Sequence, residues 1–323
     1  MKNKMTLACD LGGTNLRMAA VTDAGKILHL CRAETPKTSD PEAVVRLIAQ
    51  TADECRRAAR EAGAAEALAA AVPATVNVRE GLILKAPNVP ALDGFRFSAA
   101  VSERLALPVV LENDANAAAI GEQAFGAAKE FQSVIVVTLG TGVGGGIIID
   151  GKILRGVDGT AGEIGHICVE RGGAPCGCGS RGCVEQYASA TAITRLAREL
   201  AKNYPGSVLQ SNPQATALDI YRAGLAGDAL ALKTFERAGN LLGAALADLV
   251  NVLNPEAIVI GGGVSSAWDL LVPHVSAEIH RHAFREPAER VKILRAQLDK
   301  DVAGILGAAK TAFDFIDNGC QLR

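Results

Sequence analysis

The sequence predicts an α/β protein built from two related α/β domains. The chain has 323 residues, of which 49% are hydrophobic and 21% charged. Domains typically span ~100–200 residues, so this length suits two of them, each with its own core. Glycine-rich turns separate short apolar runs, and a segment near the start of the chain has a counterpart in the middle. This alternation is typical of α/β domains.

The internal repeat is the strongest of these observations. Residues 11–28, LGGTNLRMAAVTDAGKIL, match residues 139–154, LGTGVGGGIIIDGKIL, in order and chemistry. Each reads as a strand end, a Gly/Thr turn, a strand and a second turn. A chance likeness of two hairpins is the alternative, but the order, the turn and the exit all agree. We expect an N-terminal domain of residues 1–113 plus about 303–323 and a C-terminal domain of residues 114–302.

The first half reads as three strands, a helix and two further strands. Ser39 and Glu42 have the spacing of a capping box, and Pro41 suits the first turn of a helix. Apolar residues recur at helical spacing as far as Ala59, and Gly63 marks the end. The expected strands are residues 6–9, 16–21, 26–30, 69–72 and 109–112.

The second half begins the same pattern again. The β-rich run 134–139, the glycine turn and residues 147–149 predict another hairpin. A long helix follows at residues 228–253. The remaining expected elements are strands 257–260 and 291–296, a helix after Gly263, and a closing helix at residues 301–315.

Charge and hydropathy exclude several functional classes. The formal charge of −2 and pI of about 6.2 give no reason to expect nucleic acid or a membrane as partner. The most apolar stretch, residues 241–264, is interrupted by Asp248, Asn251, Asn254 and Pro255. The N-terminus reads as a first strand and not as a signal peptide. We therefore expect a cytoplasmic protein whose eight cysteines are reduced unless they bind metal.

Two glycine loops have the composition of phosphate-binding backbone. One is Asp10 followed by Gly12, Gly13, Thr14 and Asn15; the other contains Gly140, Thr141, Gly142 and Gly144. Residues without side chains let backbone N–H groups face an anion, and Asp10 suits Mg²⁺, directly or through water. A single such loop is explained equally well by a β-turn. Two loops in a repeated frame, with Gly261, Gly262 and Gly263 at a strand-to-helix turn, favour a nucleotide. A P-loop signature is absent from the sequence, and the dinucleotide fingerprint lacks its helix.

Asp114 is the candidate general base. It follows the apolar run 109–111 and begins the expected helix 114–124, near the positive end of the helix dipole. Phosphoryl transfer to a hydroxyl needs a proton acceptor of this kind. The alternative is that Asn113 or Asp114 only caps the helix.

His166, Cys176, Cys178 and Cys183 form a candidate metal site. One histidine and three cysteines within 18 residues suit tetrahedral zinc. A disulfide is disfavoured in the cytosol, and an iron–sulfur cluster normally uses four cysteines. A four-ligand site is closed, so the zinc would be structural. It would fix the neighbouring Glu163 and Glu185, and His166 would keep a second ring nitrogen for substrate. The other five cysteines, Cys9, Cys31, Cys55, Cys168 and Cys320, show no such spacing and are expected to be buried and inert.

These motifs resemble the ROK family, named for repressors, open reading frames and kinases. The resemblance covers nearly the whole chain. It rests on DLGGTN at Asp10, NDAN at Asn113, LGTGVGGG at Leu139, GEIGH at Gly162, CGCGSRGC at Cys176 with Glu185, and NPEAIVIGGGVS at Asn254. Within the family, bacterial glucokinases are the most similar, especially over residues 113–190.

The resemblance implies the actin-like ATPase (ribonuclease H-like) fold, with ATP and Mg²⁺ in a cleft between two domains. It implies Asp114 as the base and adenosine near residues 261–263. It implies sugar contacts from Asn88, Asn113, Asp114, Glu163, His166 and Glu185, and a homodimer. The chain differs from the common family pattern at Pro73-Ala74 and Ala91-Leu92, near the expected sugar pocket.

Three functions follow from this reading. The first is a glucokinase that phosphorylates the 6-hydroxyl of glucose and carries a structural zinc; a variant acts on mannose, fructose, N-acetylglucosamine or N-acetylmannosamine. The second is a sugar-sensing repressor, disfavoured because nine residues before Asp10 cannot hold a recognition helix. The third is an actin-like ATPase without a sugar, against which the glutamates beside the zinc motif count. Polyphosphate is an alternative phosphoryl donor.

Overall fold

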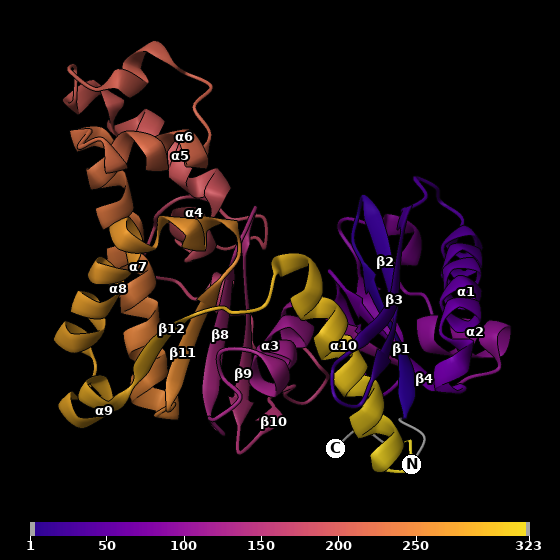
Figure 1. Ribbon diagram of the computed structural model, residues 1–323. Helices are drawn as coiled ribbons and strands as arrows, with labels where there is room; N and C mark the ends of the chain where they lie inside the picture. Colours follow the sequence, from indigo (N-terminus) through magenta and orange to yellow (C-terminus); the bar gives the residue numbers. More distant parts are fainter. Residues whose placement is uncertain (1–3, 321–323) are drawn as a thin grey trace. The chain divides into compact units, whose positions relative to one another are not determined.

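A computed structural model describes residues 4–320 of the chain, which divide into two compact units. Of the described residues, unit 1 contains 4–130, 146–162 and 297–320, and unit 2 contains 131–145 and 163–296. Figure 1 shows the order of the elements along the chain. None of the helices within residues 4–320 has the length and apolar character that a membrane span requires.

The sheet of unit 1 has the strand order β3-β2-β1-β4-β7. Its strands are β1 (Met5–Leu11), β2 (Asn15–Thr22), β3 (Ile27–Glu34), β4 (Ala65–Val72) and β7 (Val109–Asn113). The first three form an antiparallel meander, while β1, β4 and β7 are parallel. In the central strands β1 and β4, nearly every residue is buried, as expected for strands covered on both faces.

Helices cover both faces of this sheet. These are α1 (Pro41–Ala58), α2 (Phe97–Leu105), α3 (Asp114–Phe125) and α10 (Lys300–Asp317). Figure 1 shows α1 and α2 on one face and α10, from the far end of the chain, on the other. A small hairpin, β5 (Thr75–Asn77) and β6 (Leu82–Lys85), completes the unit together with β10 (Lys152–Ile153).

Helix α1 begins at Pro41, one residue later than a capping box with Ser39 as the N-cap requires. Asp40, and not Ser39, is the N-cap: its side chain accepts a hydrogen bond from the backbone N–H of Glu42 at 3.0 Å. Pro41 then occupies the first helical position, where its missing N–H costs nothing. The predicted core face of this helix is confirmed, since Val44, Ile48 and Ala52 are buried.

The second sheet has the order β10-β9-β8-β11-β12, the same pattern of hairpins and crossovers as the first. Its further strands are β8 (Val134–Leu139), β9 (Val143–Ile149), β11 (Ala257–Gly261) and β12 (Lys292–Arg295). Strands β8, β11 and β12 are parallel, as are β1, β4 and β7. The repeat predicted from the sequence is therefore present as a repeat of sheet topology.

Unit 2 carries most of the helices of the second half. They are α4 (Glu185–Ala188), α5 (Ala190–Leu200), α6 (Ala217–Leu225), α7 (Ala229–Leu253), α8 (Trp268–His282) and α9 (Arg285–Arg290). The long α7 packs against α8. It is capped by Asp228 at its start and by Asn254, in the left-handed conformation, at its end.

The boundary between the units differs from the expected division at residues 113/114 and 302/303. Helix α3 belongs to unit 1 because it meets α10 at two glycines. A β-carbon on Gly121 would lie 2.4 Å from the carbonyl oxygen of Ala303, and one on Gly307 would lie 1.6 Å from that of Ala117. Only residues without side chains allow so close a contact. Residues 146–162 pack on the same unit.

Candidate active site

The first glycine loop joins β1 to β2 at the carboxyl end of β1. The backbone N–H of Gly12 donates to the carbonyl of Asn15 at 2.8 Å, which closes the turn. The Thr35 hydroxyl donates to the carbonyl of Gly12 at 2.7 Å and holds the loop from outside. Thr14 and Asn15 are exposed. A β-carbon on Gly13 would lie 2.8 Å from that of Asn88, so the structure brings Asn88 beside this loop.

Asp10 is the penultimate residue of β1, is partly buried and is paired with Arg17. The guanidinium donates to Asp10 Oδ2 at 3.0 Å and to Asp301 Oδ1 of α10 at 2.6 Å. Burial raises the pKa of Asp10 above its usual value, although the nearby Arg17 opposes this. Sequence reasoning missed Arg17 and Asp301, because they lie 284 residues apart in the chain.

Strand register brings Asp10 and the Asn113-Asp114 pair to the same edge of the sheet. Asp10 lies opposite Ala71 of β4, and Ala71 opposite Glu112 of β7. Since β1, β4 and β7 are parallel, their carboxyl ends meet at one edge, where ligands of α/β sheets commonly bind.

Asn113 is the N-cap of α3. Its Oδ1 accepts hydrogen bonds from the backbone N–H groups of Ala115 at 2.9 Å and Asn116 at 3.1 Å, and its Nδ2 donates to the carbonyl of Ala74 at 3.2 Å. The capping role that the sequence left open between Asn113 and Asp114 therefore belongs to Asn113. Asp114 is the first residue of the helix, in the positive field of its N-terminus.

Glu112, immediately before this pair, is a charged residue that sequence reasoning passed over. Its side chain is completely buried and accepts two hydrogen bonds from Arg155. The sequence did contain a sign of this pair, because Glu112 is an acidic residue in an otherwise apolar strand. A buried carboxylate needs a hydrogen-bond or charge partner.

The second glycine loop joins β8 to β9, within residues 131–145 of unit 2, and is held by Glu185. Glu185 Oε2 accepts a hydrogen bond from the backbone N–H of Val143 at 3.0 Å. A β-carbon on Gly142 would lie 2.4 Å from the same oxygen. Glycine at 142 therefore admits the carboxylate to the loop, and the structure joins a predicted sugar ligand to a predicted phosphate loop.

The triple-glycine segment lies against this loop. Gly261 pairs with Thr138 across β11 and β8, and Gly262 has φ of +84°. A β-carbon on Gly262 would lie 2.4 Å from the carbonyl oxygen of Leu139, whereas open space surrounds Gly140 and Gly263. Two backbone-lined loops therefore meet at the carboxyl ends of β8 and β11.

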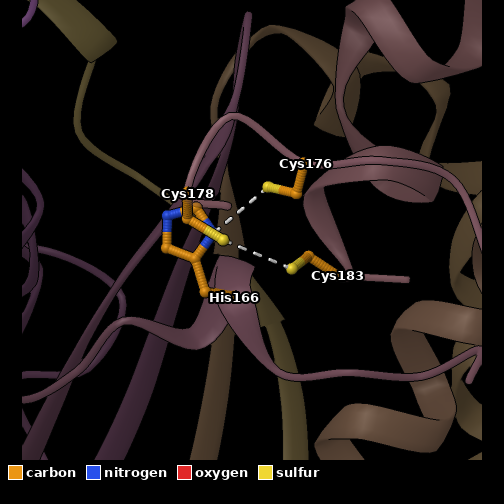
Figure 2. A group of neighbouring side chains, drawn as sticks. All are labelled: His166, Cys176, Cys178 and Cys183. Atoms are coloured by element: carbon orange, nitrogen blue, oxygen red, sulfur yellow. Dashed lines mark hydrogen bonds between the residues drawn. The ribbon is translucent and has the colours of Figure 1, made fainter. Parts of the chain in front are cut away.

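The predicted metal ligands lie together in unit 2 (Figure 2). The donor atoms of His166, Cys176, Cys178 and Cys183 all lie within 4.8 Å of one another. Cys176 Sγ is 3.6 Å from His166 Nδ1, and Cys178 Sγ is 3.7 Å from Cys183 Sγ. Around a tetrahedral zinc with Zn–S of ~2.3 Å and Zn–N of ~2.0 Å, the S···S and S···N edges are ~3.8 and ~3.5 Å. The donor set and its spacing fit zinc.

Glu163 and Glu185 flank this cluster. His166 Nε2, the ring nitrogen opposite the one that faces Cys176, lies 3.9 Å from Glu163 Oε2. Cys176 Sγ lies 4.0 Å from Glu185 Oε1. The side chains of Glu163 and His166 are partly exposed. The cluster thus lies beside two carboxylates, of which Glu163 is partly exposed and Glu185 is bonded to the second glycine loop.

The predicted site residues are divided between the units. Unit 1 holds Asp10, the loop of residues 12–15, Asn88, Asn113 and Asp114; unit 2 holds the loop of residues 140–144, Glu163, His166, Glu185 and residues 261–263. In unit 1, a backbone-rich loop and carboxylates lie at the carboxyl ends of parallel strands, and in unit 2 the Glu185 carboxylate contacts the loop that follows β8.

Comparison with known proteins places these features in a family context. The model of the ROK family matches residues 6–314. A glucokinase from Halalkalibacterium halodurans is 38% identical over 314 residues, which cover 95% of this chain and 94% of the relative. The ROK hexokinase from Thermus thermophilus has a TM-score of 0.84 at 32% identity, with 98% of this chain and 100% of that chain covered. A ROK family glucokinase from Streptomyces griseus, solved with glucose and AMPPNP, has a TM-score of 0.76 at 36% identity, with coverages of 96% and 99%.

Proposed function

The chain belongs to the ROK family, and from that premise we propose that it is an ATP-dependent hexose kinase, a glucokinase that transfers the γ-phosphate of ATP to the 6-hydroxyl of glucose. Proteins named glucokinase, with 35–38% identity, match about 95% of the chain. The observation that supports this chemistry is the placement of the Asn113 and Asp114 side chains at the start of α3. Asn113 is the N-cap, and Asp114, the first helical residue, accepts a hydrogen bond from the backbone N–H of Ala115 at 2.9 Å, so its carboxylate lies in the positive field of the helix N-terminus.

We assign the general base to Asp114. Its carboxylate accepts the proton of the 6-hydroxyl as that oxygen forms a bond to the γ-phosphorus, and the bond from phosphorus to the leaving ADP oxygen breaks. The sugar contacts are assigned to Asn88, Asn113, Asp114, Glu163, His166 and Glu185. Carboxylates suit this task because they accept hydrogen bonds from hydroxyl groups. Amides suit it because they can both accept hydrogen bonds from hydroxyl groups and donate to them.

ATP is assigned to the backbone-rich loops. The loop of Gly12, Gly13, Thr14 and Asn15 and the loop of Gly140, Thr141, Gly142 and Gly144 are assigned to the phosphates, and Gly261, Gly262 and Gly263 to adenosine. The N–H groups of Gly12 and Gly140 close these loops by donating to the carbonyls of Asn15 and Gly142 at 2.8 and 2.9 Å. Arg17 holds Asp10 Oδ2, so we assign Oδ1 to Mg²⁺ or to a water bound to it. When bound, Mg²⁺ neutralises charge on the phosphates.

We propose that His166, Cys176, Cys178 and Cys183 hold a structural zinc. Four protein ligands leave no open position, which suits a metal that organises the chain and not one that activates water. Its function here is to fix the segment that carries Glu163 and Glu185.

We also propose that the enzyme acts in the cytoplasm as a homodimer and supplies glucose 6-phosphate to glycolysis. These points rest on the family resemblance and the mild charge of the chain. Light scattering coupled to size exclusion measures the oligomer, and a monomer at working concentration contradicts the dimer.

A coupled ADP-release assay with Mg-ATP and a hexose panel tests the proposed function. The panel contains glucose, mannose, fructose, N-acetylglucosamine and N-acetylmannosamine, and we expect the largest kcat/KM for glucose. Preference for another hexose keeps the mechanism and replaces the substrate. Absence of turnover with ATP and with polyphosphate, in folded protein, refutes the kinase, and sequence-specific binding to DNA in a gel shift would then favour a sugar-sensing regulator.

A further inference from the structure

A fully buried carboxylate lies one residue before the Asn113-Asp114 pair. The side chain of Glu112 is 0% exposed, and both of its oxygens are engaged. Oε2 accepts hydrogen bonds from Arg155 Nε at 3.0 Å and Nη2 at 2.7 Å. Oε1 accepts from the backbone N–H of Asn113 at 3.0 Å and from Asn116 Nδ2 at 3.1 Å. One carboxylate therefore connects four donors in three separate residues.

The two groups on Oε1 belong to residues on either side of Asp114. Asn113 precedes it and Asn116 lies two positions beyond it, in the first turn of α3. The orientation of this turn is consequently tied to the position of the Glu112 carboxylate. Arg155 holds that carboxylate from the other side, with the planar two-bond geometry that favours one orientation.

Stability alone does not explain the pair. Burying two charges costs desolvation free energy that their attraction roughly offsets, and apolar residues of similar size often stabilise a core as well or better. The pair is confined to unit 1 and lies at the carboxyl edge of β7, where the base is assigned. A role in fixing geometry accounts for its location.

We propose that Glu112 and Arg155 are positioning residues for the general base: Arg155 orients the Glu112 carboxylate, which fixes the turn on both sides of Asp114. This inference rests on the proposed function. Without Arg155, the buried Oε2 loses both of its donors, and the carboxylate is expected to turn toward other donors or water. Its hold on Asn113 and Asn116 then weakens. A displacement of 1 Å at a reacting group is enough to lower turnover about 100-fold.

The surroundings of Arg155 allow a direct test by chemical rescue. Its side chain is 18% exposed and lines two cavities of unit 1, of about 280 and 230 Å³. In Arg155→Ala, a small guanidinium ion can therefore reach the vacated position from solvent. We expect kcat to fall about 100-fold with the glucose Kd changed less than threefold, and ethylguanidinium at millimolar concentration to restore at least tenfold. Methylammonium, which lacks the planar fork, should restore little. Lys152→Ala, which removes an exposed cation lining the larger of these cavities, is the control and should leave kcat unchanged.

A double substitution keeps the test valid if Arg155→Ala folds poorly. Arg155→Met leaves Glu112 as an unpaired buried charge, whereas Glu112→Gln/Arg155→Met removes both charges and retains an amide oxygen that can accept from Asn113. The double variant should therefore turn over about tenfold faster than Arg155→Met alone, because the two residues act as one unit. Additive losses in the double variant contradict the coupling.

Hydrogen exchange separates this inference from the proposed function. The Asn113 amide should exchange faster in Arg155→Ala than in wild type, whatever the enzyme phosphorylates. Unchanged exchange with unchanged kcat overturns the positioning role. If Arg155→Ala exchanges faster but the wild-type protein phosphorylates no hexose, the proposed function is overturned while the contact network stands. Loss of kcat and glucose affinity in parallel, without rescue, shows a purely structural role and also overturns the proposal.

Discussion

A methyl group at Gly142 should move the Glu185 carboxylate and so test its role in sugar binding. The added β-carbon would lie 2.4 Å from Glu185 Oε2, against an ordinary contact of at least 3.4 Å, so the oxygen must retreat by about 1 Å. This lengthens the 3.0 Å hydrogen bond from the Val143 N–H. A charged acceptor of this kind is worth about 1.5–3 kcal/mol.

If glucose donates a hydrogen bond to the Glu185 carboxylate in its present position, the displacement weakens that bond as well. The loss in binding free energy is then of the same size, about 1.5–3 kcal/mol. Each 1.36 kcal/mol is tenfold, so the glucose Kd of Gly142→Ala should rise roughly 10- to 150-fold. Isothermal titration without nucleotide measures it. Gly140→Ala is the matched control, since nothing lies within 4 Å of its added β-carbon, and its glucose Kd should match wild type. A glucose Kd of Gly142→Ala within twofold of wild type would refute the assignment of Glu185 to the sugar.

Three further predictions concern the base, the metal and a helix cap. Asp114→Asn should lower kcat by about 10²- to 10⁴-fold with little change in glucose affinity, and near-wild-type turnover in the coupled assay would exclude it as the base. Cys178→Ser should lose zinc in elemental analysis and lower the Tm, while Cys168→Ser, an exposed cysteine outside the cluster, should keep one zinc per chain; equal zinc in both would exclude Cys178 as a ligand. Burial raises the pKa of Asp228, but hydrogen bonds from backbone N–H groups and a serine hydroxyl outweigh it and hold that pKa below its usual value. Asp228→Ala should therefore cost about 1 kcal/mol in urea unfolding at pH 7. The folded pKa of Asp228 is lower than its unfolded pKa of ~3.9, so the stabilisation is lost as the pH falls from the unfolded value through the folded one. The cost of Asp228→Ala should therefore shrink at low pH, and an equal cost at pH 7 and pH 2.5 would contradict this.

Local patterns in the sequence predicted most of the secondary structure near the site. The expected strand of residues 134–139 is β8, the expected helix of residues 228–253 is α7 with its cap, and the repeat of the glycine hairpins appears as a repeated sheet order. The four zinc-motif residues lie together as expected, because all of them fall within 18 residues and the chain between them is rich in glycine. In these cases the interacting groups are neighbours in the chain.

Contacts between distant segments could not be predicted in this way. Arg17 meets Asp301 across 284 residues, and Arg155 meets Glu112 across 43. Cys31 and Cys55 are buried as expected, and their sulfur atoms lie 3.6 Å apart because β3 and α1 pack together. Cys168 and Cys320 are exposed, so the expectation that they are buried was wrong. The boundary between the units also depended on a helix crossing at Gly121 and Gly307. From the sequence, Gly121 and Gly307 could equally belong to turns. The packing of α3 against α10 shows that they allow the two helices to approach closely.

The assembly of unit 1 from three separate segments has a consequence for how the protein folds. Helix α10 contacts β1 and β4, so the sheet that carries the first glycine loop remains uncovered on one face until residues 300–317 have been synthesised. At 5–20 residues per second, translation leaves that Ala- and Leu-rich face exposed for roughly ten seconds or more. Contacts of such long range also slow folding itself. The nascent N-terminal segment is therefore exposed to misassociation during this time, and a protein cut before α10 would lack the helix that covers β1 and β4, although every residue of the loop after β1 is present.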